Sequence, residues 1–146
     1  MNRLAELYNE DRYAWALKNA VLMHEGRLEE VDLEHIAEEL ESMGRSERQE
    51  LINRLTVLLA HLLKWRYQPE RRGKSWRATI KEQRLRLHKH LAENPSLRSR
   101  LEESQTTAYE YAVLRVTQET PLEETTLPPE CPFSRDQILN EGYWPD

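Results

Sequence analysis

Apolar residues spaced three and four positions apart constrain the fold of this chain more than any other feature. The clearest stripe lies between residues 51 and 63 and would cover a wide arc of a helix. Its members are Leu51, Ile52, Leu55, Leu58, Leu59, Leu62 and Leu63. A helix that is apolar over such an arc is usually central in a bundle. Glycine is scarce, at four residues in 146, whereas all-β folds need many turns. The sequence therefore predicts an all-α fold.

The same periodicity, read together with capping residues, predicts five helices. They occupy residues 11–25, 32–43, 46–67, 75–93 and 95–119. Asn9 or Asp11 caps the first helix, and Gly26 suits the position just past its end. The second helix should end before Gly44, and a capping box at Ser46 should begin the third. Because the turn between these two helices is short, they are expected to be antiparallel neighbours.

Three further expectations complete the predicted architecture, a single domain over residues 1–146. Residues 1–119 should form an antiparallel bundle of four to five helices, with Leu55, Leu58, Leu62 and Ile80 buried. Tyr13, Ala16, Leu17, Ala20, Val21 and His24 share one face of the first helix, and Leu33, Ile36, Ala37 and Leu40 share one face of the second. Residues 120–146 should form a proline-rich tail with one short helix at 135–140. We expect this tail to pack on the bundle through Phe133, Ile138 and Trp144.

The sequence also indicates a compartment. Cys131 is the single cysteine, so no disulfide can form within the chain, which fits a reducing environment. The first ten residues lack the basic start and apolar run of a signal peptide. No stretch approaches the ~20 apolar residues of a membrane span. We therefore expect a cytoplasmic protein that does not associate with a membrane.

Charge is distributed unevenly along the chain. Residues 64–90 hold ten Lys and Arg against two Glu, whereas both flanking segments are acidic and the whole chain carries a net charge of −5. Two interpretations remain open. We expect many Lys and Arg of the basic stretch to pair with glutamates of the acidic helices; the competing hypothesis is that they stay unpaired and bind phosphate groups.

Several blocks of sequence resemble a known bacterial family. They are Tyr13–Trp15, Asp32–Ser46, His61–Pro69, Ser75–Ile80 with Glu82–Arg84, and Cys131–Phe133. The chain resembles domain-of-unknown-function family twenty-nine over nearly its whole length. The resemblance implies small, single-domain, all-helical bacterial proteins. It supplies no activity, cofactor or catalytic residue.

One functional hypothesis is a metal centre between facing helices. Glu34, Glu38 and Glu41 lie on one side of the second predicted helix, and His61 lies on the flank of the third. Carboxylates and a histidine from facing helices are what a metal-binding helical bundle enzyme needs. No Glu-x-x-His motif is present, and a solvated acidic face explains the same pattern.

A second hypothesis is a nucleic-acid-associated accessory protein that uses the basic stretch 64–90. Its candidate contacts are Arg71, Arg72, Lys74, Arg77, Lys81 and Arg84. Basic clusters bind phosphate backbones, and interleaved aromatic residues can stack on bases. The sequence pI near 5.6 argues against this hypothesis.

A third group comprises Gln83, His61 and Lys64, which the pattern places near the predicted core. They form either a structural hydrogen-bond network or a small-molecule pocket. No nucleotide-binding glycine loop or nucleophile motif is present, so no cofactor is expected. The sequence favours a non-catalytic binding or interaction module that acts on an unidentified protein partner through charged helical faces.

Overall fold

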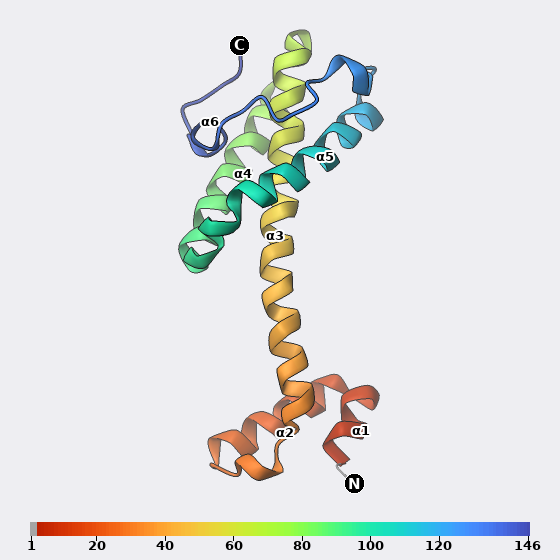
Figure 1. Cartoon of the computed structure of the whole chain (residues 1–146), viewed down its shortest axis with the longest axis vertical. Helices are drawn as coiled ribbons and strands as arrows, with labels where there is room; N and C mark the ends of the chain where they lie inside the picture. The colour runs from red at the N-terminus through yellow and green to blue at the C-terminus, as the bar shows by residue number, and fades with distance from the viewer. Residues whose placement is uncertain (1–2) are drawn as a thin grey trace. The chain divides into compact units, whose positions relative to one another are not determined.

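The computed structural model describes residues 3–146, and its regular structure is entirely helical (Figure 1). The α-helices are α1 (Arg3–Glu10), α2 (Arg12–His24), α3 (Leu33–Tyr67), α4 (Lys74–Glu93), α5 (Leu101–Glu119) and α6 (Arg135–Leu139). Short 3₁₀ helices occupy Leu28–Glu30, Pro69–Arg71, Pro95–Arg100 and Glu124–Thr126. The predicted all-α class is confirmed. Within residues 3–146, no helix combines the length and the apolarity needed to cross a membrane.

Two compact units make up the chain, residues 1–46 and residues 47–146. The first unit contains α1, α2 and residues 33–46 of α3. The second contains the rest of α3 and everything that follows it. The single domain and the antiparallel bundle expected from the sequence stay predictions.

Several helix boundaries follow from capping residues in the sequence. The Asp11 side chain accepts a hydrogen bond from the Ala14 amide at 3.0 Å and caps α2. Gly26 has a φ of +75°, the left-handed conformation expected just beyond a helix end. Ser134 and Gln137 form a capping box, with reciprocal bonds of 3.1 and 3.0 Å, at the start of α6, the short helix predicted at 135–140. These local predictions are confirmed.

The predicted break at Gly44 is wrong, because α3 runs without interruption from Leu33 to Tyr67. Among the described glycines, only Gly26 has a positive φ, so Gly44 keeps an ordinary helical backbone. A glycine within a helix costs about 1 kcal/mol relative to alanine, which flanking helical hydrogen bonds can outweigh. Ser46 and Gln49 lie inside the helix, where the backbone already satisfies the amides that a capping box would serve.

The start of the last long helix also differs from the prediction. The chain forms a 3₁₀ helix at Pro95–Arg100 before α5 begins at Leu101, instead of one α-helix from residue 95. Pro95 occupies the first turn of the 3₁₀ helix, a position that suits the fixed φ of proline. Asn94 contributes no side-chain cap to that turn.

The core of the second unit is one cluster of buried apolar side chains drawn from α3, α4, α5 and the residues after α5. Leu55, Leu58, Leu62 and Ile80 are buried in it, as predicted. Phe133 and Ile138 are buried in the same cluster, and the Trp144 ring lies 4.7 Å from the Trp65 ring. Residues far apart in sequence therefore share this core.

Candidate functional site

A buried polar network joins α2 to the start of α3 in the first unit. The Asp32 carboxylate accepts bonds from Trp15 Nε1 at 3.0 Å and from His35 Nδ1 at 2.6 Å. The Asp32 amide donates to the Asn19 side chain at 2.8 Å, and Asn19 donates to the Trp15 carbonyl at 2.8 Å. Buried polar groups need such partners, so the network fixes the rotation of α2.

Tyr8 of α1 and Arg12 of α2 add an aromatic and a charged contact to this network. The Tyr8 ring stacks on His35 with its centroid 4.0 Å away, and its hydroxyl donates to Glu39. Arg12 lies 3.5 Å from the Tyr8 ring centroid and pairs with Glu39 at 2.9 Å. The hydrogen bond to Glu39 raises the pKa of Tyr8, and burial raises it further. Tyr8 therefore acts as a neutral donor at ordinary pH.

This arrangement turns the apolar face predicted for the first helix toward solvent. Tyr13 is 76% exposed, and Leu17 and Val21 are also exposed, whereas Trp15 is buried. The face of the first helix on which the spacing gathers most apolar residues is therefore exposed, and the opposite face is the buried one. Spacing alone favoured the face with more apolar residues, but the Trp15 indole N–H requires a buried acceptor and finds it in Asp32.

The stripe predicted for the second helix is also largely uncovered. Leu40 and Met43 on α3 are 61% and 60% exposed, and Leu33 is exposed as well. The sequence placed these residues against an antiparallel neighbour after Gly44. The continuous course of α3 provides no such neighbour at that turn.

A groove of about 460 Å³ runs between α2 and the start of α3. Its α2 wall is Trp15, Ala16, Asn19, Ala20 and Met23, and its α3 wall is Ile36, Glu39, Leu40, Ser42, Met43 and Ser46. The two alanines leave space beside the backbone, and the two methionines are flexible and polarizable. The groove is therefore mainly apolar and adaptable.

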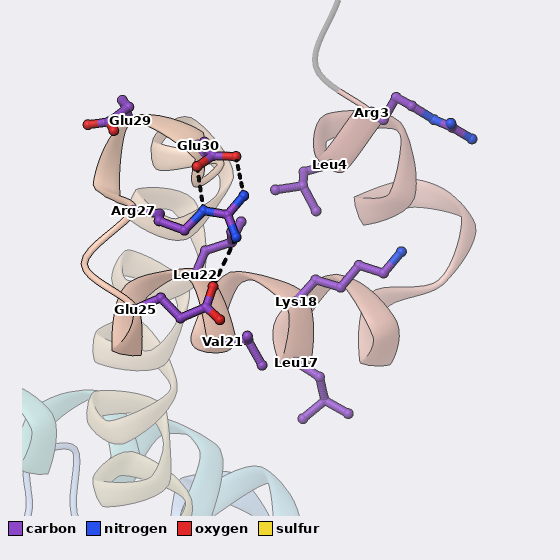
Figure 2. Close-up of a pocket in the computed structure, with 10 residues that line it drawn as sticks. All are labelled: Arg3, Leu4, Leu17, Lys18, Val21, Leu22, Glu25, Arg27, Glu29 and Glu30. Carbon is purple, nitrogen blue, oxygen red and sulfur yellow. Dashed lines mark hydrogen bonds and ion pairs between the residues drawn. The ribbon is translucent and has the colours of Figure 1, made fainter.

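A second hollow, of about 900 Å³, lies on the first unit beside the other flank of α2 (Figure 2). Its apolar lining is Leu4, Leu17, Val21 and Leu22, and its charged lining is Arg3, Lys18, Glu25, Arg27, Glu29 and Glu30. Arg27 pairs with Glu25 at 3.0 Å and with Glu30 at 2.6 Å, and dashed lines in Figure 2 mark these interactions. Arg27 is therefore neutralised by its own neighbours.

The continuous course of α3 does not bring together the residues of the facing-helix metal site expected from the sequence. Glu34, Glu38 and Glu41 are exposed in the first unit, and His61 belongs to the second. All four lie on one helix, so the turn that would bring them together at a metal does not exist. No group of three or more His, Cys, Asp and Glu among residues 3–146 could hold a metal ion.

His61 instead has a local partner. Its Nδ1 donates to the Val57 carbonyl at 2.8 Å. Burial lowers the pKa of His61, and the positive charge of Lys64 lowers it further. Gln83 is buried, but its Oε1 has no hydrogen-bond partner within the described chain, and neither His61 nor Lys64 bonds to it. The three residues do not form the predicted hydrogen-bond network.

The six basic candidates divide into two sets. Arg84 is fully buried and donates to the carbonyls of Gln137, Ile138 and Tyr143 at 2.7–2.9 Å, while Arg72 Nε donates to the Trp65 carbonyl at 2.6 Å. These two arginines therefore donate hydrogen bonds to backbone carbonyls of the chain itself. The other four, Arg71, Lys74, Arg77 and Lys81, are exposed.

The prediction that the basic stretch would be neutralised by glutamates is wrong for most of its members. Lys64 pairs with Glu119 on α5, and Arg86 pairs with Glu82 one turn away at 3.3 Å. Across residues 3–146, no other Lys or Arg between 64 and 90 has a carboxylate partner within 4 Å. Closeness in sequence to acidic helices does not by itself produce ion pairs, because the charged side chains must also lie on helix faces that contact each other.

The Asp32 network was missed as a unit by sequence reasoning. The spacing Asp32-x-x-His35 was visible, and it places the two side chains on adjacent turns. The contribution of Asn19 carried no local signal, because it depends on the packing of α2 against residue 32.

The comparisons with known proteins give one match. A family model described as domain of unknown function DUF29 matches residues 7–144. No curated protein and no solved structure matches the chain.

Proposed function

The chain belongs to the family of domain of unknown function DUF29, and from that premise we propose that it is a non-catalytic interaction module. Its first unit binds an amphipathic helix of a protein partner. The binding site is the groove between α2 and residues 33–46 of α3, which we call the α2–α3 groove.

One observation carries this proposal: the apolar stripes of the first unit are exposed instead of buried. Leu40 and Met43 on α3, and Met23 on α2, line the α2–α3 groove and are each exposed. Contiguous apolar surface of this kind marks an interaction site more often than chance placement does. Single apolar residues scattered over a surface would not carry the same weight.

The shape of the groove favours a helix as the bound element. Two packed helices leave a furrow between them, and a third helix fills it with side chains at positions i, i+3, i+4 and i+7. The small side chains of Ala16 and Ala20 permit close approach, and Met23 and Met43 can adjust to the incoming residues. The Asp32 network keeps both walls in register without the partner.

Site-specific photo-crosslinking in the cells that normally make the protein tests the proposal. A photoreactive side chain at Met43 should give one discrete adduct of higher mass, because this position lines the groove. The same side chain at Glu41, which is exposed outside the groove, is the matched control and should give none. The added substitution Leu40→Glu should abolish the Met43 adduct.

The mass of the adduct identifies the partner. A product of twice the chain's mass would assign a second copy as the partner, and any other discrete mass would assign a different protein. Equal labelling from Met43 and Glu41, or no adduct from either, would contradict the proposed function.

A further inference from the structure

We propose that the exposed face of α4 binds the phosphate backbone of a nucleic-acid duplex without sequence preference. The contacts are Lys74, Arg77, Lys81 and Lys89, which we call the α4 cation row. This proposal concerns the second unit alone and does not depend on the α2–α3 groove.

The α4 cation row follows from helical geometry. The steps from Lys74 to Arg77, from Arg77 to Lys81 and from Lys81 to Lys89 are three, four and eight residues, so all four share one face. At 1.5 Å per residue the row spans about 22 Å. Over that distance a duplex presents roughly a dozen phosphate charges, because it carries one per ~1.7 Å.

These four cations are free of acidic partners. No carboxylate within residues 3–146 lies within 4 Å of any of them. Glu82, the acidic residue beside Lys81 in the sequence, is paired with Arg86 at 3.3 Å. A ligand phosphate would therefore replace water and counterions, not an intrachain ion pair.

Arg77 is held in place before any ligand arrives. Its guanidinium carbon lies 5.4 Å from the Trp65 ring and 5.2 Å from the Trp144 ring. Contacts of a cation with an aromatic face restrict the side chain but leave its N–H groups able to donate. This reduces the entropy lost when Arg77 contacts a phosphate.

The same contacts favour a duplex over a single strand. Trp65 is buried, and the Trp144 ring packs against it at 4.7 Å. Rings committed in this way offer no free platform for unpaired bases, on which single-strand binding usually depends. The α4 cation row can therefore bind nucleic acid only through the charges of the phosphate backbone, which a duplex presents as well.

The net charge of −5 does not prevent such binding. Exposed charges are screened over about 8 Å at physiological ionic strength, so a phosphate beside α4 responds mainly to the local row. The affinity should nevertheless be modest, because only four cations take part.

A fluorescence anisotropy titration of the full chain with a labelled 24-base-pair DNA of arbitrary sequence tests the proposal. We expect binding at 50 mM salt that weakens as salt rises, with a log–log slope of about −3 to −4, since each phosphate contact contributes about −0.9. The double variant Lys74→Gln/Lys81→Gln should weaken binding at least tenfold at 50 mM salt. Glutamine matches lysine closely in helix propensity, so the helix should be retained.

The matched control is Arg86→Gln, which removes an exposed cation of α4 that is already paired with Glu82. It should change the affinity less than twofold. The proposal is overturned by no binding at 50 mM salt, by a slope near zero, or by equal losses in the two variants. Tighter binding of the unpaired strand, of polyglutamate or of phosphatidylserine vesicles would also overturn it, by assigning a different partner.

Discussion

Asp32 shows how one side chain sets the exposure of its neighbours. Its carboxylate holds the indole of Trp15 and the imidazole of His35, and this fixes which face of α2 is buried. Burial acts to raise the pKa of Asp32, but the hydrogen bonds from Trp15 and His35 outweigh it and hold the pKa below its ordinary value. The charged form is therefore the native form.

Replacing Asp32 with Asn should lower the free energy of unfolding by about 1–3 kcal/mol near neutral pH, the usual cost of losing charge-assisted hydrogen bonds in a buried site. A carboxyl with a lowered native pKa stabilises the fold above its unfolded pKa of about 3.9, and this contribution is lost as pH falls through the native pKa. The difference between wild type and variant should therefore shrink below about pH 4. Denaturant titrations from pH 3 to 7 measure this difference in the free energy of unfolding. A difference that grows in acid would refute the conclusion that the charged form of Asp32 stabilises the fold.

Gly26 and Gly44 make a matched pair, because alanine should act in opposite directions at the two positions. Gly26 has a φ of +75°, so Gly26→Ala should destabilise the protein by about 1 kcal/mol. Gly44 is helical, and an added Cβ would meet nothing within 4 Å, so Gly44→Ala should stabilise by about 0.5–1 kcal/mol. Thermal unfolding monitored by circular dichroism compares them. If Gly44→Ala destabilises the protein, α3 is not continuous there.

At the scale of elements, α4 and α6 are joined by a buried arginine. Burial lowers the pKa of Arg84, and its guanidinium meets three carbonyls around the end of α6. The planar fork of arginine carries donors on three nitrogens and so reaches three separated carbonyls, whereas the three donors of a lysine ammonium all lie on one nitrogen.

Arg84→Lys should therefore lower the free energy of unfolding by about 2–3 kcal/mol, since at least one buried carbonyl is left without a donor. Arg86→Lys, at an exposed position of the same helix where lysine can still pair with Glu82, is the control and should change stability by less than about 0.5 kcal/mol. Urea denaturation measures both variants. Similar effects of the two substitutions would show that the carbonyl contacts contribute little.

The elements also show which features can be predicted from sequence. Asp11, Gly26 and Ser134 act on residues within one turn, so a local pattern was sufficient to find these boundaries. The break at Gly44 failed because a glycine fits both a helix end and a helix interior. The role of Arg84 had no local pattern, because its acceptors lie more than 50 residues away.

At the scale of the whole molecule, the two units differ in how much they bury. In the first unit the buried residues among those described are Trp15, Asn19, Val31 and Asp32, whereas the apolar core cluster belongs entirely to the second. Sequence periodicity located that cluster because many apolar residues share one helix face. In the first unit, periodicity did not show that the apolar stripes, including those that line the α2–α3 groove, are exposed. Exposed and buried apolar stripes have the same spacing.

Amide hydrogen exchange should reflect this difference. Amides of α2 should exchange faster than those of α3 between Leu55 and Leu63, because local opening is easier where few apolar side chains are buried. Exchange measured by mass spectrometry on peptides from the full chain gives both rates. Equal protection in the two segments would contradict the expectation.

The bonds of Arg84 to the carbonyls of residues 137–143 have a consequence for the protein while it is being made. A ribosome adds about 5–20 residues per second, so Tyr143 follows Arg84 after roughly 3–12 s. During that interval the nascent chain carries an arginine without its acceptors and a leucine-rich α3 without Phe133 and Ile138. Chaperones that shield apolar segments during translation thus have several seconds in which to act before the second unit can close.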